Sequence, residues 1–234
     1  MAAADGAKGT ASKKTNFYVI IPAHNEEKNI GTVLEKTEKF AAAGKIVVVD
    51  DGSRDGTTAA AKKHGVTVLR HIINLGKGAA LRTGCQYCYS KGAEALVFMD
   101  SDGQHDPEDL PRLLAALAGN DIVFTYRDKR STHMPFVKKF GNWFIDALMR
   151  MLFHISVTDT QCGYKAMTRS AYEKLNLMSN DYSIESEIVA KTGKYKLKFV
   201  QLPIRTFYSD RYKGTTVFDG INIAMKMLWW RIAR

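Results

Sequence analysis

The stretch VFMDSDGQHDPEDL, residues 97–110, joins an apolar run to a dense group of acids. The run ends at Asp100, and Asp102 follows two positions later. Carboxylates this close repel each other and resist burial unless a cation binds between them. Carboxylate and amide oxygens beside a flexible glycine favour a hard cation. The stretch therefore predicts a Mg²⁺ or Mn²⁺ site made by Asp100, Asp102 and Gln104.

This stretch has two alternative interpretations. An EF-hand loop does not fit, because Gly103 falls at loop position four instead of six, a proline follows and a strand precedes. A solvated acidic turn remains the alternative when Asp-x-Asp is taken alone. His105 and His24 are interpreted as turn residues, with metal ligation as the alternative for both.

Outward from this stretch, apolar and amphipathic segments alternate. Short, nearly all-apolar stretches typical of buried strands lie at 16–21, 45–50, 66–71, 94–100 and 121–126. Helical patterns lie between and after them, at 26–40, 55–65, 77–92 and 107–119. This alternation predicts an α/β domain with a mixed, largely parallel sheet flanked by helices. Ligands are expected at the carboxyl ends of its strands.

The second half has a different pattern. It contains an apolar helix at 142–155, the motif 159–170, a helix near 184–192 and a basic strand pair near 195–208. We interpret this half as an elaboration of the α/β domain that forms the side of the site where an acceptor molecule binds. The predicted division is a flexible tail at 1–15, the α/β domain at 16–214 and an amphipathic, membrane-facing helix at 215–234.

Composition limits the class of protein. The 234 residues are 45% hydrophobic and 25% charged, enough for one domain with a full core. No signal peptide and no uncharged apolar run of about 18 residues is present, so we expect a cytoplasmic protein. Three cysteines make no disulfide framework, and Cys85 and Cys88 are expected in the core.

The net charge of +10 lies mostly in the last fifth of the chain. A basic end on a balanced body indicates an anionic partner such as a phosphate group, nucleic acid or a lipid surface. A basic nucleic-acid-binding module is the non-enzymatic alternative, but it needs no acid-rich strand ends. A merely soluble basic surface is the other alternative.

Four motifs occur in order: IPAHNEEKNIG (21–31), VVVDDGSRDGT (47–57), NLGKGAALRTG (74–84) and MDSDGQHDPEDL (99–110). Together they resemble the family-two glycosyltransferases of the GT-A (Rossmann-like) fold over residues 16–126. The motif DTQCGYKAMTRS (159–170) and the ending INIAMKMLWWRIAR (221–234) resemble the polyprenyl-phosphate branch, the dolichyl-phosphate glucosyltransferases and mannose synthases.

The resemblance implies roles at matching positions. The implied nucleotide-binding residues are Pro22, Ala23, Asn25, Glu26, Asp50 or Asp51, Lys77, Asp100 and Lys213. The implied catalytic residues are Asp102, Arg127 and Arg211. Arg211 and Lys213 would close over the diphosphate from a loop and neutralise the charge that grows as the sugar leaves.

The acceptor is expected to be a phosphate. The Glu-Asp base motif and the Gln-x-x-Arg-Trp motif of polysaccharide-building relatives are missing. A phosphate needs no base, because its second pKa of about 6 leaves it dianionic at neutral pH. The cations expected around it are Arg127, Arg130, Lys138 and Lys139. Asp159 is either a base for a hydroxyl acceptor or a structural residue of its turn.

The sequence thus predicts metal-dependent, inverting transfer of a hexose from a sugar nucleotide to dolichyl or polyprenyl phosphate. The motif 159–170 favours UDP-glucose or UDP-N-acetylglucosamine over GDP-mannose. A transferase to a hydroxyl acceptor is the nearest alternative; a nucleotidyltransferase lacks support because its Gly-rich loop is absent. Helices 142–155 and 217–234, with Trp229 and Trp230, are expected to dock on the cytoplasmic membrane face, with the help of a membrane partner protein or a second copy. The alternative is that both helices pack onto the protein core or a second subunit.

Overall fold

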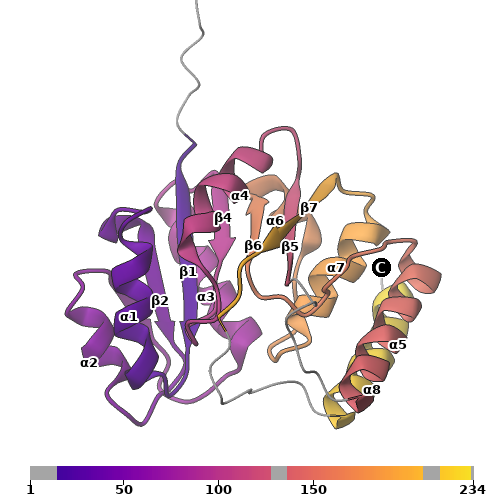
Figure 1. Ribbon diagram of the computed structural model, residues 1–234, viewed down its shortest axis with the longest axis horizontal. Coiled ribbons are helices and arrows are strands. Elements are labelled where there is room, and N and C mark those ends of the chain that lie inside the picture. The colour runs from indigo at the N-terminus through magenta and orange to yellow at the C-terminus, as the bar shows by residue number, and fades with distance from the viewer. Residues whose placement is uncertain (1–14, 128–135, 208–216, 233–234) are drawn as a thin grey trace, which may run out of the picture.

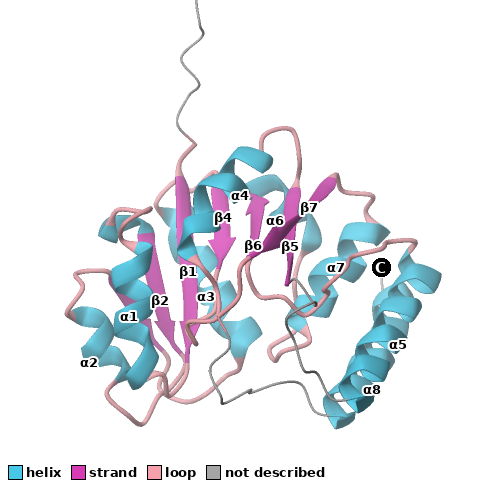
Figure 2. Ribbon diagram, viewed as in Figure 1, coloured by secondary structure: helices cyan, strands magenta, loops and turns pink. Residues whose placement is uncertain are grey.

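The computed structural model describes residues 15–127, 136–207 and 217–232. They form a seven-stranded sheet with helices on both faces (Figures 1 and 2). The strands are β1 (Phe17–Ala23), β2 (Ile46–Asp50), β3 (Thr67–Arg70), β4 (Ala95–Phe98), β5 (Ile122–Arg127), β6 (Lys165–Thr168) and β7 (Phe199–Ile204). The helices are α1 (Glu27–Thr37), α2 (Thr57–Lys62), α3 (Lys77–Ser90), α4 (Leu110–Ala116), α5 (Phe136–Phe153), α6 (Arg169–Leu175), α7 (Ile184–Lys194) and α8 (Val217–Ile232), with 3-10 turns at Ala43–Lys45 and Pro107–Asp109.

The first half confirms the predicted alternation of strands and helices. All five predicted strands are present, and β1 pairs in parallel with both β2 and β4. The sheet order is β3-β2-β1-β4-β6-β5-β7. Because β1, β2, β3 and β4 run in the same direction, their carboxyl ends meet at one edge of the sheet. The mixed, largely parallel sheet expected from the sequence is therefore confirmed.

The second half completes this sheet, and here one prediction needs correction. The motif 159–170 contains a strand, β6, that lies antiparallel between β4 and β5 and places Ala166 opposite both Val97 and Val123. The strand pair predicted near 195–208 is wrong, because the described part of that segment has one strand, β7, paired in parallel with β5. Beyond β7, Thr206 makes only an isolated bridge with His105.

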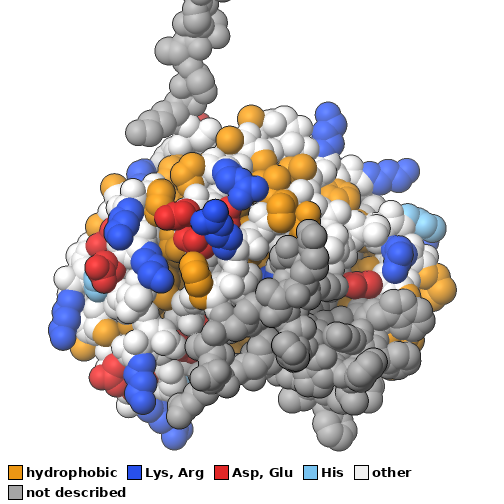
Figure 3. All heavy atoms as spheres, viewed as in Figure 1, with side chains coloured by type: hydrophobic (Ala, Val, Ile, Leu, Met, Phe, Trp, Pro, Cys, Tyr) orange, Lys and Arg blue, Asp and Glu red, His pale blue; other side chains and the backbone are white. Residues whose placement is uncertain are grey.

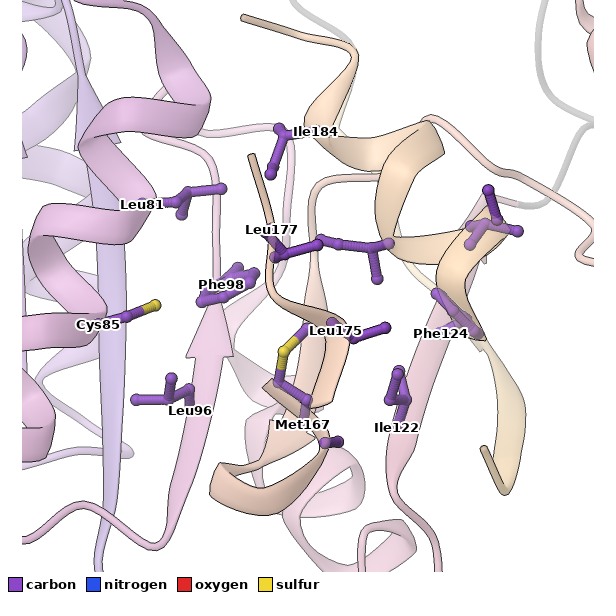
Figure 4. Packing of buried hydrophobic residues seen from close by; sticks show 14 of the residues in the cluster. Leu81, Cys85, Leu96, Phe98, Ile122, Phe124, Met167, Leu175, Leu177 and Ile184 are labelled. Atoms are coloured by element: carbon purple, nitrogen blue, oxygen red, sulfur yellow. The ribbon is translucent and has the colours of Figure 1, made fainter. Parts of the chain in front are cut away.

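Two apolar cores cover the two faces of the sheet. Side chains alternate along β1, so Ile20 joins one core while Val19 and Ile21 join the other. The first core lies under α3, α5, α6, α7 and α8, and the second under α1, α2 and α4. Figure 4 shows part of the first core, where Cys85 of α3 lies among aliphatic side chains. Cys85 and Cys88 are fully buried, as predicted.

Helices α5 and α8 pack side by side along one flank of the molecule (Figure 1). Met227 and Trp230 bury one side of α8 in the first core. Trp230 was therefore assigned wrongly to a membrane-facing surface, since only 6% of it is exposed. Trp229 and Ile232 do point outward and are 67% and 78% exposed. In the described part of the chain, no helix is both long enough and apolar enough to cross a bilayer.

Candidate active site

A cavity of about 460 Å³ opens where β1, β2, β4 and β5 end. Three groups of predicted site residues line it. They are the nucleotide-binding candidates Pro22, Ala23, Glu26, Asp51, Lys77 and Asp100, the metal-binding candidates Asp100, Asp102 and Gln104, and the acceptor candidate Arg127. The structure thus brings together residues from four strand ends, of which the first, at Ala23, and the last, at Arg127, are more than 100 positions apart in the sequence.

The end of β2 holds two neighbouring carboxylates with different surroundings. Asp51 lines the cavity and accepts hydrogen bonds from the backbone N–H groups of Leu75, at 2.9 Å, and Gly76, at 2.8 Å. Asp50 is fully buried, where it accepts from the N–H of Ser53 at 2.9 Å and from the Thr58 hydroxyl. Of the two residues that the sequence left open, Asp51 is the one that lines the cavity.

Asn25 and His24 follow β1 and shape the same loop. Asn25 has a left-handed backbone (φ 55°), and its side-chain oxygen accepts from the N–H of Arg54 at 2.9 Å. It does not line the cavity. His24 does, and its Nδ1 lies 2.8 Å from the backbone oxygen of Asp51. The sequence predicts that Asn25 lines the nucleotide pocket, whereas in the structure the neighbouring His24 lines the cavity.

The acidic loop after β4 is held by its own backbone and by neighbours. Asp102 accepts from the N–H of Gln104 at 3.0 Å, and the Gln104 carbonyl accepts from Phe207 N–H at 2.9 Å. The His105 ring stacks on Tyr164 with a centroid distance of 5.3 Å. These contacts fit a turn-shaping role for His105.

The two carboxylates of this loop differ in their electrostatic environment. Burial raises the pKa of Asp102, and the adjacent negative Asp100 raises it further. Burial alone would also raise the pKa of Asp100, but the Lys77 ammonium outweighs it and holds that pKa well below its usual range. Asp100 therefore stays ionised, and Asp102 is stabilised when a cation binds beside it.

Lys77 connects the acidic loop to an ion-pair chain that sequence reasoning missed. Its Nζ lies 2.5 Å from Asp100 Oδ1 and 2.8 Å from Oε1 of Glu185, the second residue of α7. The other oxygen of Glu185 pairs with Lys165 of β6, which is fully buried and also donates to the Cys162 carbonyl. One feature of the sequence could have indicated Glu185: the segment IESE (184–187) is acidic although it lies in a basic half of the chain.

The turn before β6 packs directly on the acidic loop. A Cβ added at Gly163 would lie 2.3 Å from Oδ2 of Asp100, so only glycine allows this backbone to approach the carboxylate. Gly163 and Gln161 both line the cavity. The motif 159–170 therefore contributes a wall of the cavity as well as a strand of the sheet.

Arg127, at the end of β5, is held by Asp159 of the same motif. Arg127 Nε lies 2.7 Å from Asp159 Oδ2, and Nη2 lies 3.0 Å from Oδ1. Burial alone would raise the pKa of Asp159, but the bonds and charge of Arg127 hold it below the usual value. The other predicted cations lie outside the residues whose side chains are described: Arg130, Lys138, Lys139, Arg211 and Lys213.

The predicted metal site can be compared with the donors that are present. Across residues 15–127, 136–207 and 217–232, no group of three or more His, Cys, Asp or Glu is arranged to hold a metal ion. Asp100, Asp102 and Gln104 supply two carboxylates and an amide around one cavity wall. Mg²⁺ commonly binds through one or two carboxylates and completes its shell with phosphate oxygens and water. The donor set therefore fits an ion that arrives with a diphosphate.

The fold and its acidic strand-end cavity are those of a nucleotide-sugar-dependent transferase. The model of the family described as glycosyl transferase family 2 matches residues 18–176. The chain belongs to this family and is a glycosyltransferase.

Similar proteins cover nearly the whole chain. An uncharacterized protein of Methanocaldococcus jannaschii is 36% identical over 94% of this chain and 93% of its own length. The UDP-N-acetylglucosamine–dolichyl-phosphate N-acetylglucosaminyltransferase of Methanococcus voltae is 30% identical over 93% of this chain and 97% of its own. The polyprenol monophosphomannose synthase of Mycolicibacterium smegmatis is 30% identical over 89% and 83%.

A solved structure is similar in fold. Glucosyl-3-phosphoglycerate synthase from Mycobacterium tuberculosis, in complex with Mg²⁺ and UDP, superposes with a TM-score of 0.74 over 93% of this chain and 79% of that one. Its sequence is 20% identical, so the likeness establishes the fold alone. It agrees with the GT-A-like α/β fold expected from the motifs.

Proposed function

We propose that this glycosyltransferase transfers a hexose from a nucleoside diphosphate sugar to dolichyl or another polyprenyl phosphate, with inversion at the anomeric carbon. The observation that carries the proposal is one cavity that combines the acid pair Asp100 and Asp102 with the cations Lys77 and Arg127. The relatives named for lipid-phosphate acceptors support the same class of acceptor.

The donor occupies the side of the cavity formed by β1, β2 and β4. Asp51 and Glu26 face the nucleoside, and Asp100, Asp102 and Gln104 hold Mg²⁺ or Mn²⁺. The ion, when bound, supplies positive charge to the leaving diphosphate. Lys77 adds a second positive charge beside Asp100, and Arg211 and Lys213 are proposed to complete the diphosphate site.

A phosphate acceptor agrees with the state of the nearby carboxylates. A hydroxyl acceptor needs a carboxylate that takes up a proton. Glu185 is bound by two lysines. Burial alone would raise the pKa of Asp159, but Arg127 outweighs burial and holds that pKa low. Asp159 is therefore a weak base in this arrangement. A phosphate dianion needs no base: its oxygen bonds to the anomeric carbon while the bond to the diphosphate breaks, and the nucleoside diphosphate leaves with the electron pair.

Arg127 is the proposed first contact of the acceptor phosphate. Its guanidinium lines the cavity and is already oriented by a two-point bond to Asp159. The carboxylate fixes the plane of the guanidinium, so that its positive charge is held at the cavity, where a phosphate can pair with it. Arg130 and either Lys138 or Lys139 remain proposed as further acceptor cations.

The nucleotide is proposed to be a uridine nucleotide, with glucose or N-acetylglucosamine as the sugar. The relatives include an enzyme named for UDP-N-acetylglucosamine and one named for mannose transfer, so the proposal rests on the motif 159–170. The proposed place of action is the cytoplasmic face of a membrane, where the enzyme binds peripherally and supplies a lipid-linked sugar for glycosylation.

A basic nucleic-acid-binding module receives less support. On the face in Figure 3, the described Lys and Arg side chains are scattered among acidic and apolar ones. Nucleic-acid binding normally uses a stripe of like charge. A transferase to a hydroxyl acceptor remains the second candidate function.

The test has two arms. In the first, UDP and GDP are titrated calorimetrically with Mn²⁺ present; tighter binding of UDP is expected, and tighter binding of GDP reassigns the sugar to mannose. In the second, the enzyme is incubated with each sugar nucleotide and polyprenyl phosphate in detergent, and the lipid extract is analysed by mass spectrometry. A β-linked sugar phosphate on the lipid is expected. Product on a hydroxyl acceptor but none on lipid phosphate would overturn the proposal.

A further inference from the structure

Two loops at the mouth of the cavity expose large apolar side chains. The loop between β3 and α3 carries Ile72, which is 100% exposed, Ile73, which is 64% exposed, and Leu75. The loop before α7 carries Met178, 71% exposed, and Tyr182, 66% exposed. Single exposed apolar residues are ordinary, but a gathering of them beside a binding site indicates an interaction surface. These five residues are called the apolar rim.

The two loops form one continuous surface. The Asn180 carbonyl accepts from the N–H groups of Gly78, at 2.7 Å, and Ala79, at 3.2 Å, at the start of α3. Arg82 of α3 donates to the Ser179 carbonyl at 2.5 Å. These hydrogen bonds hold the loop before α7 against the start of α3, which directly follows the other loop. The two loops therefore lie at the same end of α3.

The rim is also continuous with the cavity. Asn74, Gly76 and Tyr182 line the cavity, although their neighbours Ile73 and Leu75 point into solvent. The backbone of this segment is tied to Asp51 by its N–H groups. A molecule that lies on the rim therefore reaches the mouth of the cavity directly.

We propose that the apolar rim inserts into the surface of the lipid bilayer that carries the polyprenyl phosphate. This inference rests on the proposed function, because a lipid acceptor must place its phosphate in the cavity while its chain stays in hydrocarbon. Apolar side chains beside the cavity mouth allow both at once. Arg70, two residues before Ile72, has a side chain that is 55% exposed and that pairs with the buried Asp50 at 3.7 Å.

The rim differs in position from the flank formed by α5 and α8. In Figure 1, α8 starts near the edge of the sheet where the strands end and runs away from it. Among the α8 side chains that the structure describes, those of Met225, Leu228, Trp229 and Ile232 are exposed. The rim, in contrast, borders the cavity itself. A bilayer that delivers an acceptor phosphate to the cavity must pass close to the rim.

The experiment compares two variants of the full chain. The rim variant carries Ile72→Ser and Ile73→Ser; the flank variant carries Trp229→Ser and Ile232→Ser. All four side chains are exposed, so both variants are expected to keep the melting temperature of the wild type. Flotation with vesicles of phosphatidylcholine and phosphatidylglycerol is measured first, without any substrate. The rim variant should float several-fold less than the wild type, and the flank variant should float nearly as well.

Kinetics separate this inference from the proposed function. With long-chain polyprenyl phosphate in vesicles, the rim variant should show a KM raised about tenfold. With a water-soluble short-chain polyprenyl phosphate, its KM should equal that of the wild type. Equal flotation of the rim variant and the wild type overturns the docking role, as does rim-dependent self-association without vesicles, which would assign the rim to a second copy. Failure of the wild type on both acceptors would overturn the proposed function, while flotation still decides the role of the rim.

Discussion

The two walls of the cavity satisfy their carboxylates in different ways. On the wall formed by β1, β2 and β4, Asp51 accepts two backbone N–H groups and Asp102 accepts one. On the wall formed by β5, β6 and α7, Asp159 pairs with Arg127 and Glu185 pairs with Lys165. Except for Asp100, which pairs with Lys77, the first wall is organised by backbone N–H groups, and the second by ion pairs between distant segments.

This difference has consequences for stability and for chemistry. A carboxylate held by backbone N–H groups can be neutralised without leaving another charge buried. Removing one member of a buried ion pair leaves its partner uncompensated, which is far more destabilising. We therefore expect substitutions on the first wall to affect mainly binding and catalysis, and removal of the Glu185 charge on the second wall to affect mainly the fold.

The largest expected effect is that of Glu185→Gln. The amide removes the negative charge that compensates Lys165, whose side chain is fully buried. The free energy of unfolding should fall by about 3–5 kcal/mol, measured by urea denaturation. The matched control is Glu173→Gln, which breaks the exposed pair with Arg169 and should leave the denaturation midpoint unchanged. Equal midpoints for the two variants would show that the buried chain of ion pairs does not support the fold.

Asp102→Asn should have the next largest effect, and on activity alone. The side chain keeps its shape but loses the charge that binds the divalent ion, so turnover should fall roughly 10²–10³-fold while the unfolding midpoint stays the same. A chelator should reproduce the loss in the wild type, and added Mg²⁺ or Mn²⁺ should restore it. Full turnover in excess chelator would remove the metal from the proposed function.

Sequence reasoning was effective for the first wall because its signals are local. The acidic loop follows β4 within a few positions, and Asp102 is bonded to Gln104 two residues away. The strands are almost entirely apolar, so their sheet and its binding edge could be predicted. Asp50 and Asp51 could not be told apart, because only the turn geometry decides which of them faces the cavity.

The second wall could be predicted only in outline. Strand β6 has four residues, and its position between β4 and β5 depends on pairing with segments that lie about 40 and 70 positions earlier. Glu185 and Lys77 are separated by more than 100 positions, so no local pattern joins them. Arg127 was identified through the resemblance, but its partner Asp159 was left between two roles until the structure showed the pair.

Arg127→Ala tests whether the second wall also binds the acceptor. A phosphate that loses a charged partner loses roughly 1.5–3 kcal/mol, so the KM for lipid phosphate should rise at least tenfold. The affinity for UDP with Mn²⁺, measured by calorimetry, should change little, because the proposed donor site lies on the other wall. Asp159→Asn is the control, since it removes the partner but keeps the guanidinium. A fall in UDP affinity with acceptor saturation unchanged would reverse the assignment of the two walls.

Lys77 is the residue that joins the two walls, and its replacement should give the smallest effect but with a distinctive sign. Its ammonium lies between Asp100 and Glu185, where it occupies one carboxylate that a divalent ion needs. Lys77→Met should therefore strengthen Mn²⁺ binding without nucleotide by roughly threefold, because a competing positive charge is lost. The same variant should weaken UDP binding in saturating Mn²⁺, because the diphosphate loses a cation.

Lys45→Met is the control of equal charge change, since Lys45 bonds to Asn16 at the opposite end of β1. Titration of Mn²⁺ by electron paramagnetic resonance and of UDP by calorimetry gives both affinities. If Lys77 has only a structural role, its replacement should lower both affinities together. Opposite shifts would instead show that Lys77 leaves Asp100 and pairs with the diphosphate when the donor binds.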